Sequence, residues 1–101
     1  YSFLEENQNS IKGVTMNGVA PTYKTISDFS YPGARAMFIY VKGAHMNAIQ
    51  GLKPFIAEYA SAWNPDGYLT RRGLIASPDA TRAEMTKRAT ALTPMTGADL
   101  K

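Results

Sequence analysis

An uninterrupted run of apolar and aromatic residues from Ala36 to Val41 is the feature that most constrains how this chain can fold. The run does not alternate with polar residues, so neither face of a strand built from it would sit comfortably in water. Its last four residues are aromatic or β-branched, and a glycine lies on either side of it, which favours a strand over a helix. The pattern predicts a short central strand near residues 35–42 that other segments cover on both faces.

The length of the chain limits what can provide that cover. With 101 residues and 11.0 kDa, it is a single small domain or a fragment, and 45% hydrophobic residues argue against disorder. We expect an α/β fold, with α+β as the alternative: a short sheet whose central strand is covered by helices. The expected order is a helix end, hairpin and short helix in 1–30, the central strand in 31–42, helical cover in 49–92 and a frayed tail in 93–101.

Local signals in the first thirty residues predict a hairpin and a short helix. Asn17-Gly18 is a strong hairpin signal, because both residues tolerate positive φ. It would join a short strand at 11–16 to a brief return that ends before Pro21. Thr22 has the character of an N-cap and predicts a helix over 23–28.

The second half of the chain reads as helical. A helix starting near Gly51 or Leu52 is predicted by apolar residues that recur three or four apart: Ile49, Leu52, Phe55, Ile56, Tyr59, Ala60 and Trp63. A short helix over 67–72 follows, with Asp66 as its cap. A third helix is expected from about 78 to 92, opened by Ser77 and Pro78.

Charge and composition exclude several classes of site. The net charge is +3, from 11 basic and 8 acidic residues that are scattered, so we predict no nucleic-acid partner. The chain has no cysteine, and the single histidine, His45, cannot build a metal site alone. No run approaches the eighteen or so apolar residues of a membrane span. We therefore expect no metal, no cofactor and no membrane helix.

No group of residues predicts catalysis. His45 lies just after the predicted strand, but no nucleophile motif or fixed acid accompanies it, and a loop histidine with a backbone partner is the simpler interpretation. Three carboxylates could be considered for acid–base work, yet each is more simply a cap or turn former: Asp28, Asp66 and Asp79. We predict that the chain is not an enzyme and assign no catalytic residue.

Arginines are the remaining candidates for holding an anion. Arg71-Arg72 is more simply a solvated last helical turn that complements the helix dipole. Arg35 flanks the predicted strand, where a guanidinium needs a carboxylate or several carbonyls, and we interpret it as structural. No glycine-rich phosphate loop of the P-loop or dinucleotide type is present.

A set of segments spread over most of the chain resembles the C-terminal third of phosphate-binding proteins, the substrate-binding subunits of ABC phosphate importers. Segments 51–59 and 73–75 also match the order of elements in that family, and the tail from Ala76 is similar only to some longer members. The segments that carry the resemblance most clearly are Tyr1–Asn7, Ile11–Val19, Pro21-Thr22, Asp28–Pro32, Arg35 and Phe38–Lys42.

The resemblance implies a function and a location. It implies the C-terminal part of a type II periplasmic-binding-protein-like fold, from a periplasmic or secreted parent that binds inorganic phosphate and delivers it to an ABC permease. The family's arginine followed by Ser-Gly-Thr is absent here, and residues 33–36 lack the usual Leu and Pro. Because the family's phosphate ligands come mainly from upstream segments, we assign no phosphate-binding residue in this chain.

Two further expectations follow. The chain begins at Tyr1 without an initiator methionine or leader, so we expect that its start is processed or truncated and that a signal peptide is not part of it. The alternative to a transport fragment is a stand-alone, non-enzymatic interaction domain that pairs through exposed strand edges, with possible self-association.

Overall fold

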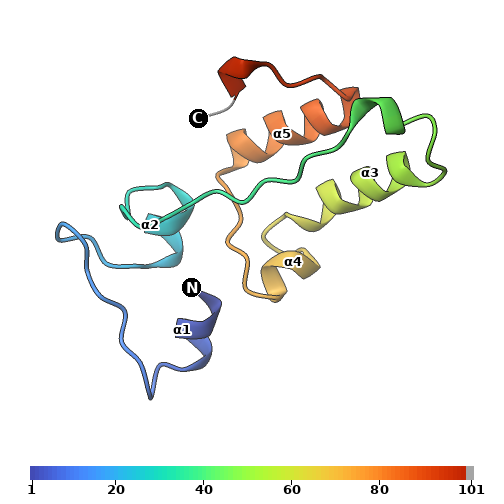
Figure 1. Ribbon diagram of the computed structural model, residues 1–101. Helices are drawn as coiled ribbons and strands as arrows, with labels where there is room; N and C mark the ends of the chain where they lie inside the picture. Colours follow the sequence, from blue (N-terminus) through green and yellow to red (C-terminus); the bar gives the residue numbers. More distant parts are fainter. Residues whose placement is uncertain (100–101) are drawn as a thin grey trace.

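The computed structural model describes residues 1–99 as a string of short helices joined by irregular segments (Figure 1). Helix accounts for 44% of the chain and strand for 2%. Within residues 1–99 the only β pairing is an isolated antiparallel bridge between Met16 and Val19. The elements in order are α1 Ser2–Glu6, α2 Tyr23–Ser27, the 3-10 helix η1 Gly43–His45, α3 Leu52–Ala62, α4 Tyr68–Arg71, α5 Asp79–Ala91 and the 3-10 helix η2 Gly97–Asp99.

The predicted α/β fold is therefore wrong, and so is its central strand near residues 35–42. This segment runs as an extended, unpaired trace between α2 and η1 (Figure 1). Among residues 1–99, no backbone hydrogen bond is made by the main chain of 35–41. A strand needs a neighbour to complete its ladder of N–H and C=O groups. The described chain offers no second strand, because residues 11–15 are irregular and the return ends at Pro21.

The turn at Asn17-Gly18 and the helix capped by Thr22 are confirmed, whereas the short strand predicted over 11–16 is wrong, because only Met16 of that segment pairs. Asn17 and Gly18 have φ of 51° and 78°, and they place Met16 and Val19 in a bridge of two 2.9 Å hydrogen bonds. Thr22 caps α2, since its hydroxyl accepts from the backbone N–H of Thr25, and Thr25 in turn accepts from the Thr22 N–H. These features form because they need only neighbouring residues.

The helical half begins at α3, which starts after Gly51 in the left-handed conformation at φ 86°. α5 lies beside α3 (Figure 1), and the Trp63 indole N–H donates to the Thr86 hydroxyl at 3.3 Å. The helix predicted over 78–92 is observed at 79–91 with Pro78 as N-cap, and Ser77 does not cap it. α5 has no buried residue, so its attachment depends on a few contacts such as Trp63 to Thr86.

The buried core of residues 1–99 is small and made mostly of small side chains. No large side chain is fully buried, and four of the six buried apolar residues are alanines: Ala34, Met46, Ile56, Ala60, Ala62 and Ala76. The molecule extends over 48 × 28 × 19 Å with a radius of gyration of 16.1 Å, against about 13 Å for a compact domain of this length. The chain thus buries little apolar surface for its size.

Three contacts among the described residues attach the N-terminal third to the segment between α4 and α5. The backbone of Ala76 is bonded on both sides, because its N–H donates to the Tyr23 hydroxyl at 3.2 Å and its C=O accepts from the Ser27 hydroxyl at 2.7 Å. Ser2 of α1 packs directly on the backbone of Gly73. These contacts join residues about fifty or more positions apart and hold α1 and α2 against the helical half.

The end of the described chain is tied back onto α5. The Asp99 carboxylate accepts from the backbone N–H of Thr96 and from the Arg88 guanidinium, each at 2.8 Å. The Thr96 N–H first, and Arg88 after it, lower the pKa of Asp99 from 3.8 to about 2. A lowered carboxyl pKa stabilises this turn above pH 3.8, and the contribution is lost as the pH falls toward 2. Of the tail expected to fray over 93–101, residues 100 and 101 lie outside the described residues.

The contact between Ser2 and Gly73 leads to a testable prediction. Gly73→Ala should lower the free energy of unfolding by about 1–3 kcal/mol, because a side chain at positive φ is strained. Gly73 has φ 94°, and its new Cβ would collide with Ser2. The matched control is Gly43→Ala, at a glycine without positive φ and with nothing within 4 Å of the added Cβ. Urea unfolding measures both changes, and equal stabilities for the two variants would contradict this packing.

Candidate functional site

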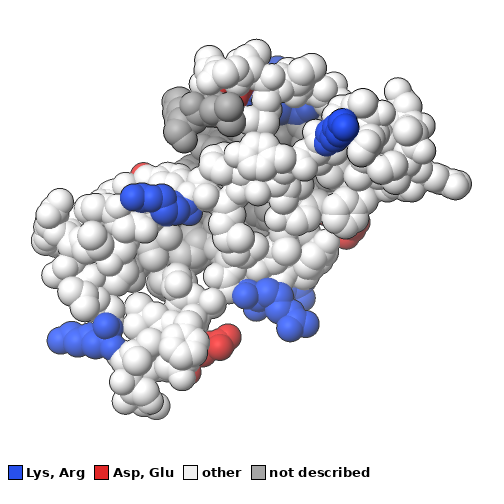
Figure 2. Space-filling model, in the orientation of Figure 1, with Lys and Arg blue, Asp and Glu red and all other residues white. Residues whose placement is uncertain are grey.

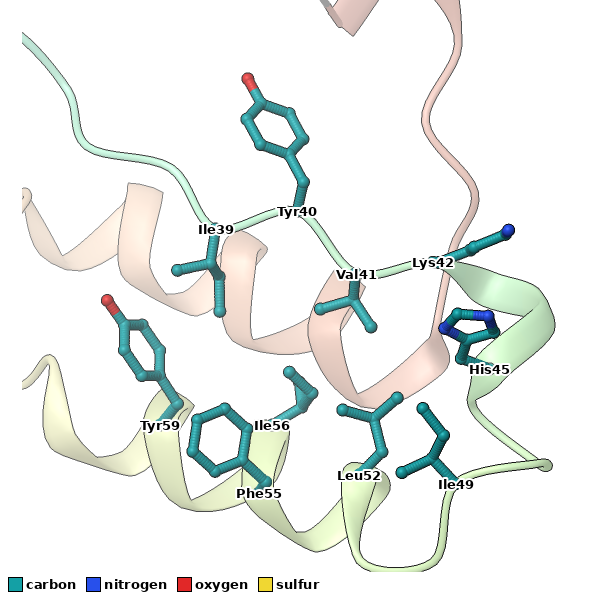
Figure 3. Close-up of a pocket in the computed structure, with 10 residues that line it drawn as sticks. All are labelled: Ile39, Tyr40, Val41, Lys42, His45, Ile49, Leu52, Phe55, Ile56 and Tyr59. Atoms are coloured by element: carbon teal, nitrogen blue, oxygen red, sulfur yellow. The ribbon is translucent and has the colours of Figure 1, made fainter.

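An open apolar groove of about 400 Å³ lies beside the extended segment (Figure 3). It lies between the end of the extended segment, the 3-10 helix η1 and one face of α3. Eight of its ten lining residues are aliphatic or aromatic, and Lys42 and His45 lie at one end: Ile39, Tyr40, Val41, Lys42, His45, Ile49, Leu52, Phe55, Ile56 and Tyr59.

The extended segment presents two different faces to its surroundings. Ile39 and Val41 point toward α3, whereas Tyr40 projects to the opposite side (Figure 3). This alternation is what an extended backbone imposes, since successive side chains point to opposite faces. One face of the segment thus contacts α3, and the other faces away from it.

The face that points away from α3 carries two large aromatic rings. Phe38 is 68% exposed and Tyr40 is 67% exposed, and their ring centroids lie 6.4 Å apart. Met37, next to them, is 80% exposed. These three exposed apolar side chains lie next to unpaired backbone groups, an arrangement typical of surfaces that bind another chain.

The wall formed by α3 contains a row of aromatic side chains one helical turn apart. Phe55 and Tyr59 have ring centroids 6.5 Å apart, and Tyr59 meets Trp63 edge-on at 6.1 Å. Ile56 lies beneath the extended segment and is only 7% exposed, while Phe55 at the rim is 60% exposed. The apolar stripe predicted for this helix is therefore only partly covered.

His45 lies at the polar end of the groove near Lys42 (Figure 3). Its backbone carbonyl accepts from the N–H groups of Ala48 and Ile49. Within residues 1–99 its imidazole makes no hydrogen bond to a carboxylate, so nothing there orients it as a base. Arg35 donates to the carbonyls of Ala34 at 2.8 Å and Pro32 at 3.3 Å, as a structural arginine would.

The carboxylates considered for acid–base work lie on separate elements. Asp28 accepts from the Ser30 hydroxyl at 2.6 Å, and this bond lowers its pKa below the usual value. Asp79 pairs with Arg82 at 2.7 Å on the first turn of α5. Asp66 does not cap α4, whose N-cap is Gly67, but its carbonyl accepts from Arg71 at 3.0 Å. The structure does not bring these carboxylates together.

Other kinds of site can be considered for the described part of the chain. Residues 1–99 contain no cluster of three or more histidine, cysteine, aspartate or glutamate side chains able to hold a metal ion. On the face shown in Figure 2, basic side chains lie as separate spots and do not form a stripe. None of the described helices is long and apolar enough to cross a membrane.

Comparisons with protein-family models, with curated proteins and with solved structures found no match to this chain. A function is therefore inferred from the sequence resemblance and from the geometry of the exposed surface.

The apolar stripe of α3 could be predicted from its spacing, but the groove beside it could not. Periodicity tells which face of a helix is apolar and does not tell what covers that face. The two hydrogen bonds to the Ala76 backbone, here called the Ala76 clamp, were also not predicted, because Tyr23 and Ser27 lie 53 and 49 positions away. No local pattern in the sequence signals such a contact.

The difference in burial between Ile56, beneath the extended segment, and Phe55, at the rim of the groove, can be tested. Ile56→Ala should lower the free energy of unfolding by about 2–4 kcal/mol, because it leaves a cavity under the extended segment. Phe55→Ala, the matched control, should cost about 1 kcal/mol or less although it removes more atoms, because that ring is mostly exposed. Urea unfolding followed by Trp63 fluorescence measures both, and a larger loss for Phe55→Ala would contradict this arrangement.

Proposed function

We propose that this chain is a C-terminal segment of a periplasmic phosphate-binding protein, whose intact form binds inorganic phosphate and delivers it to an ABC permease. Its residues from Tyr1 to about Ile75 resemble that family in order and in several short motifs. The structural observation that supports the proposal is a large uncovered apolar surface centred on residues 36–41.

The size of the uncovered surface argues that something outside this chain covers it. The accessible surface is 7813 Å², whereas a compact monomer of 11.0 kDa exposes about 5,600 Å². The excess of about 2,200 Å² exceeds the roughly 800 Å² that each partner buries in a typical protein complex. An excess of this size fits a segment that is permanently covered by further chain better than one that meets a transient partner.

The exposure of the extended segment supports the same conclusion. Met37, Phe38 and Tyr40 are each at least two-thirds exposed, and the main chain of 35–41 makes no backbone hydrogen bond within residues 1–99. Unpaired main-chain groups beside apolar side chains are satisfied together when another extended segment binds alongside. Under the proposal, that segment belongs to the parent protein.

Phosphate itself is held by the parent in this proposal. Arg35 donates to two backbone carbonyls, and Arg82 and Arg88 are paired with Asp79 and Asp99. The phosphate ligands would therefore come from segments upstream, and binding would involve no chemical step.

Calorimetric titration of the chain with inorganic phosphate tests this division of roles. We expect no stoichiometric binding in the submillimolar range, because the ligands lie outside the chain. Submillimolar binding at one phosphate per chain would contradict the proposal. The coding sequence upstream provides the independent check: a signal peptide and an arginine followed by Ser-Gly-Thr are expected there, and their absence would also contradict it.

A second candidate function is a stand-alone, non-enzymatic interaction domain that associates through the same extended segment. The exposed rings of Phe38 and Tyr40 favour it. Charge does not favour self-association: Arg35 and Lys42 flank the run, so antiparallel pairing of two copies about its centre would place like charges opposite each other.

Light scattering after size-exclusion chromatography separates the two candidates. Under the transport proposal we expect no discrete dimer, because the uncovered surface is shaped for other parts of a parent. A concentration-dependent dimer that disappears in Phe38→Asp, and persists in the matched variant Phe3→Asp on α1, would favour the interaction domain. Phe3 is a suitable control because its ring is also 68% exposed.

A further inference from the structure

The turn at Asn17 and Gly18 stands apart from the proposed function and carries a different chemistry. Both residues are exposed, and apart from Gly18 itself and its neighbours Asn17 and Val19 no described residue has an atom within 4 Å of the Cβ position at Gly18. Within residues 1–99, the side chain of Asn17 makes no hydrogen bond and the backbone N–H of Gly18 has no backbone acceptor. The side-chain amide and the next backbone nitrogen are thus both unhindered.

We propose that Asn17 is a modification site at which the side-chain amide is lost spontaneously as ammonia. The Gly18 backbone nitrogen attacks the Asn17 Cγ and forms a five-membered succinimide, and the displaced amide nitrogen leaves as ammonia with the proton from Gly18. Water then opens the ring at one of its two carbonyls. The products are aspartate or isoaspartate, and the net change consumes one water and releases one ammonia.

The chain has a second place where glycine follows an asparagine or aspartate, at Asp66-Gly67. Comparing the two pairs shows that the fold, and not the dipeptide alone, selects Asn17. Asp66 is also followed by glycine, and its carboxyl could form the same ring. There, however, the N–H of Gly67 donates to the Asn64 carbonyl at 2.8 Å, and Gly67 is packed against the backbone of Ala62. The attacking nitrogen at Gly67 is engaged and confined, whereas the one at Gly18 is not.

Two other asparagines provide internal references for the effect of glycine. Asn9 and Asn47 are exposed, as Asn17 is, but they are followed by Ser10 and Ala48. A Cβ on the following residue hinders approach of its nitrogen to the asparagine side chain, and glycine has none. Asn17 therefore combines exposure with the least hindered nitrogen.

The modification changes the only β pairing in residues 1–99. Met16 and Val19 exchange two 2.9 Å hydrogen bonds across this turn. Isoaspartate adds one carbon to the main chain between them, so both bonds cannot keep their geometry. The Met16 sulfur, which lies 3.2 Å from the Cβ position at Gly33, would lose its fixed place over the turn that starts the extended segment.

Incubation of the full chain at mildly alkaline pH in heavy-oxygen water, followed by peptide mass spectrometry, tests the proposal. We expect conversion of Asn17 to be several-fold faster than that of Asn9 or Asn47, with one heavy oxygen incorporated. We also expect isoaspartate to form more slowly at Asp66 than at Asn17. Equal rates at the three asparagines, or faster isomerisation at Asp66, would overturn the proposal.

A matched variant and a second readout separate the chemistry from a general loss of structure. Asn17→Gln replaces the five-membered ring with a slower six-membered one, so conversion at this position should fall several-fold while Asn9 and Asn47 are unchanged. In the chain that retains Asn17, exchange protection of the Met16 and Val19 amides should decline in step with the isoaspartate fraction. Protection that persists in fully converted protein would contradict the structural consequence.

Discussion

The uncovered backbone and side chains of residues 36–41 are the constraint on which the rest of the structure depends. A polar backbone group needs a hydrogen-bond partner, and an apolar side chain favours cover from water. Ile39 and Val41 find partial cover on α3, whereas Phe38 and Tyr40 do not. The groove and the exposed ring pair both result from this shortage of neighbours.

The small core explains why the helical half cannot supply that cover. Ala60 and Ala62 of α3 and Ala76 between α4 and α5 are buried, so elements approach closely but remove little apolar area from water. α5 has no buried residue, and its apolar side chains are alanines apart from Met85. A helix with so little apolar surface cannot reach across and also cover the extended segment.

Short-range features were predictable from the sequence, and long-range ones were not. Thr22 was predicted to cap α2, and the Asn17-Gly18 turn was predicted to reverse the chain, because each is decided by adjacent residues. The prediction of a strand near 35–42 was wrong, because β-branched and aromatic residues indicate that a segment can pair as a strand but do not supply a second strand. The stripe of α3 was anticipated, but its open side depends on residues elsewhere in the fold.

The Ala76 clamp has a consequence for how the N-terminal third separates from the helical half. The Tyr23 and Ser27 hydroxyl groups each bond one of the two peptide groups that flank the Ala76 Cα, and they add little contact area. Hydrogen bonds of this kind exchange with water at a small net cost in free energy. Separating the N-terminal third from the helical half would therefore break these two hydrogen bonds and the packing of Ser2 on Gly73, and it would leave the aromatic row on α3 in place.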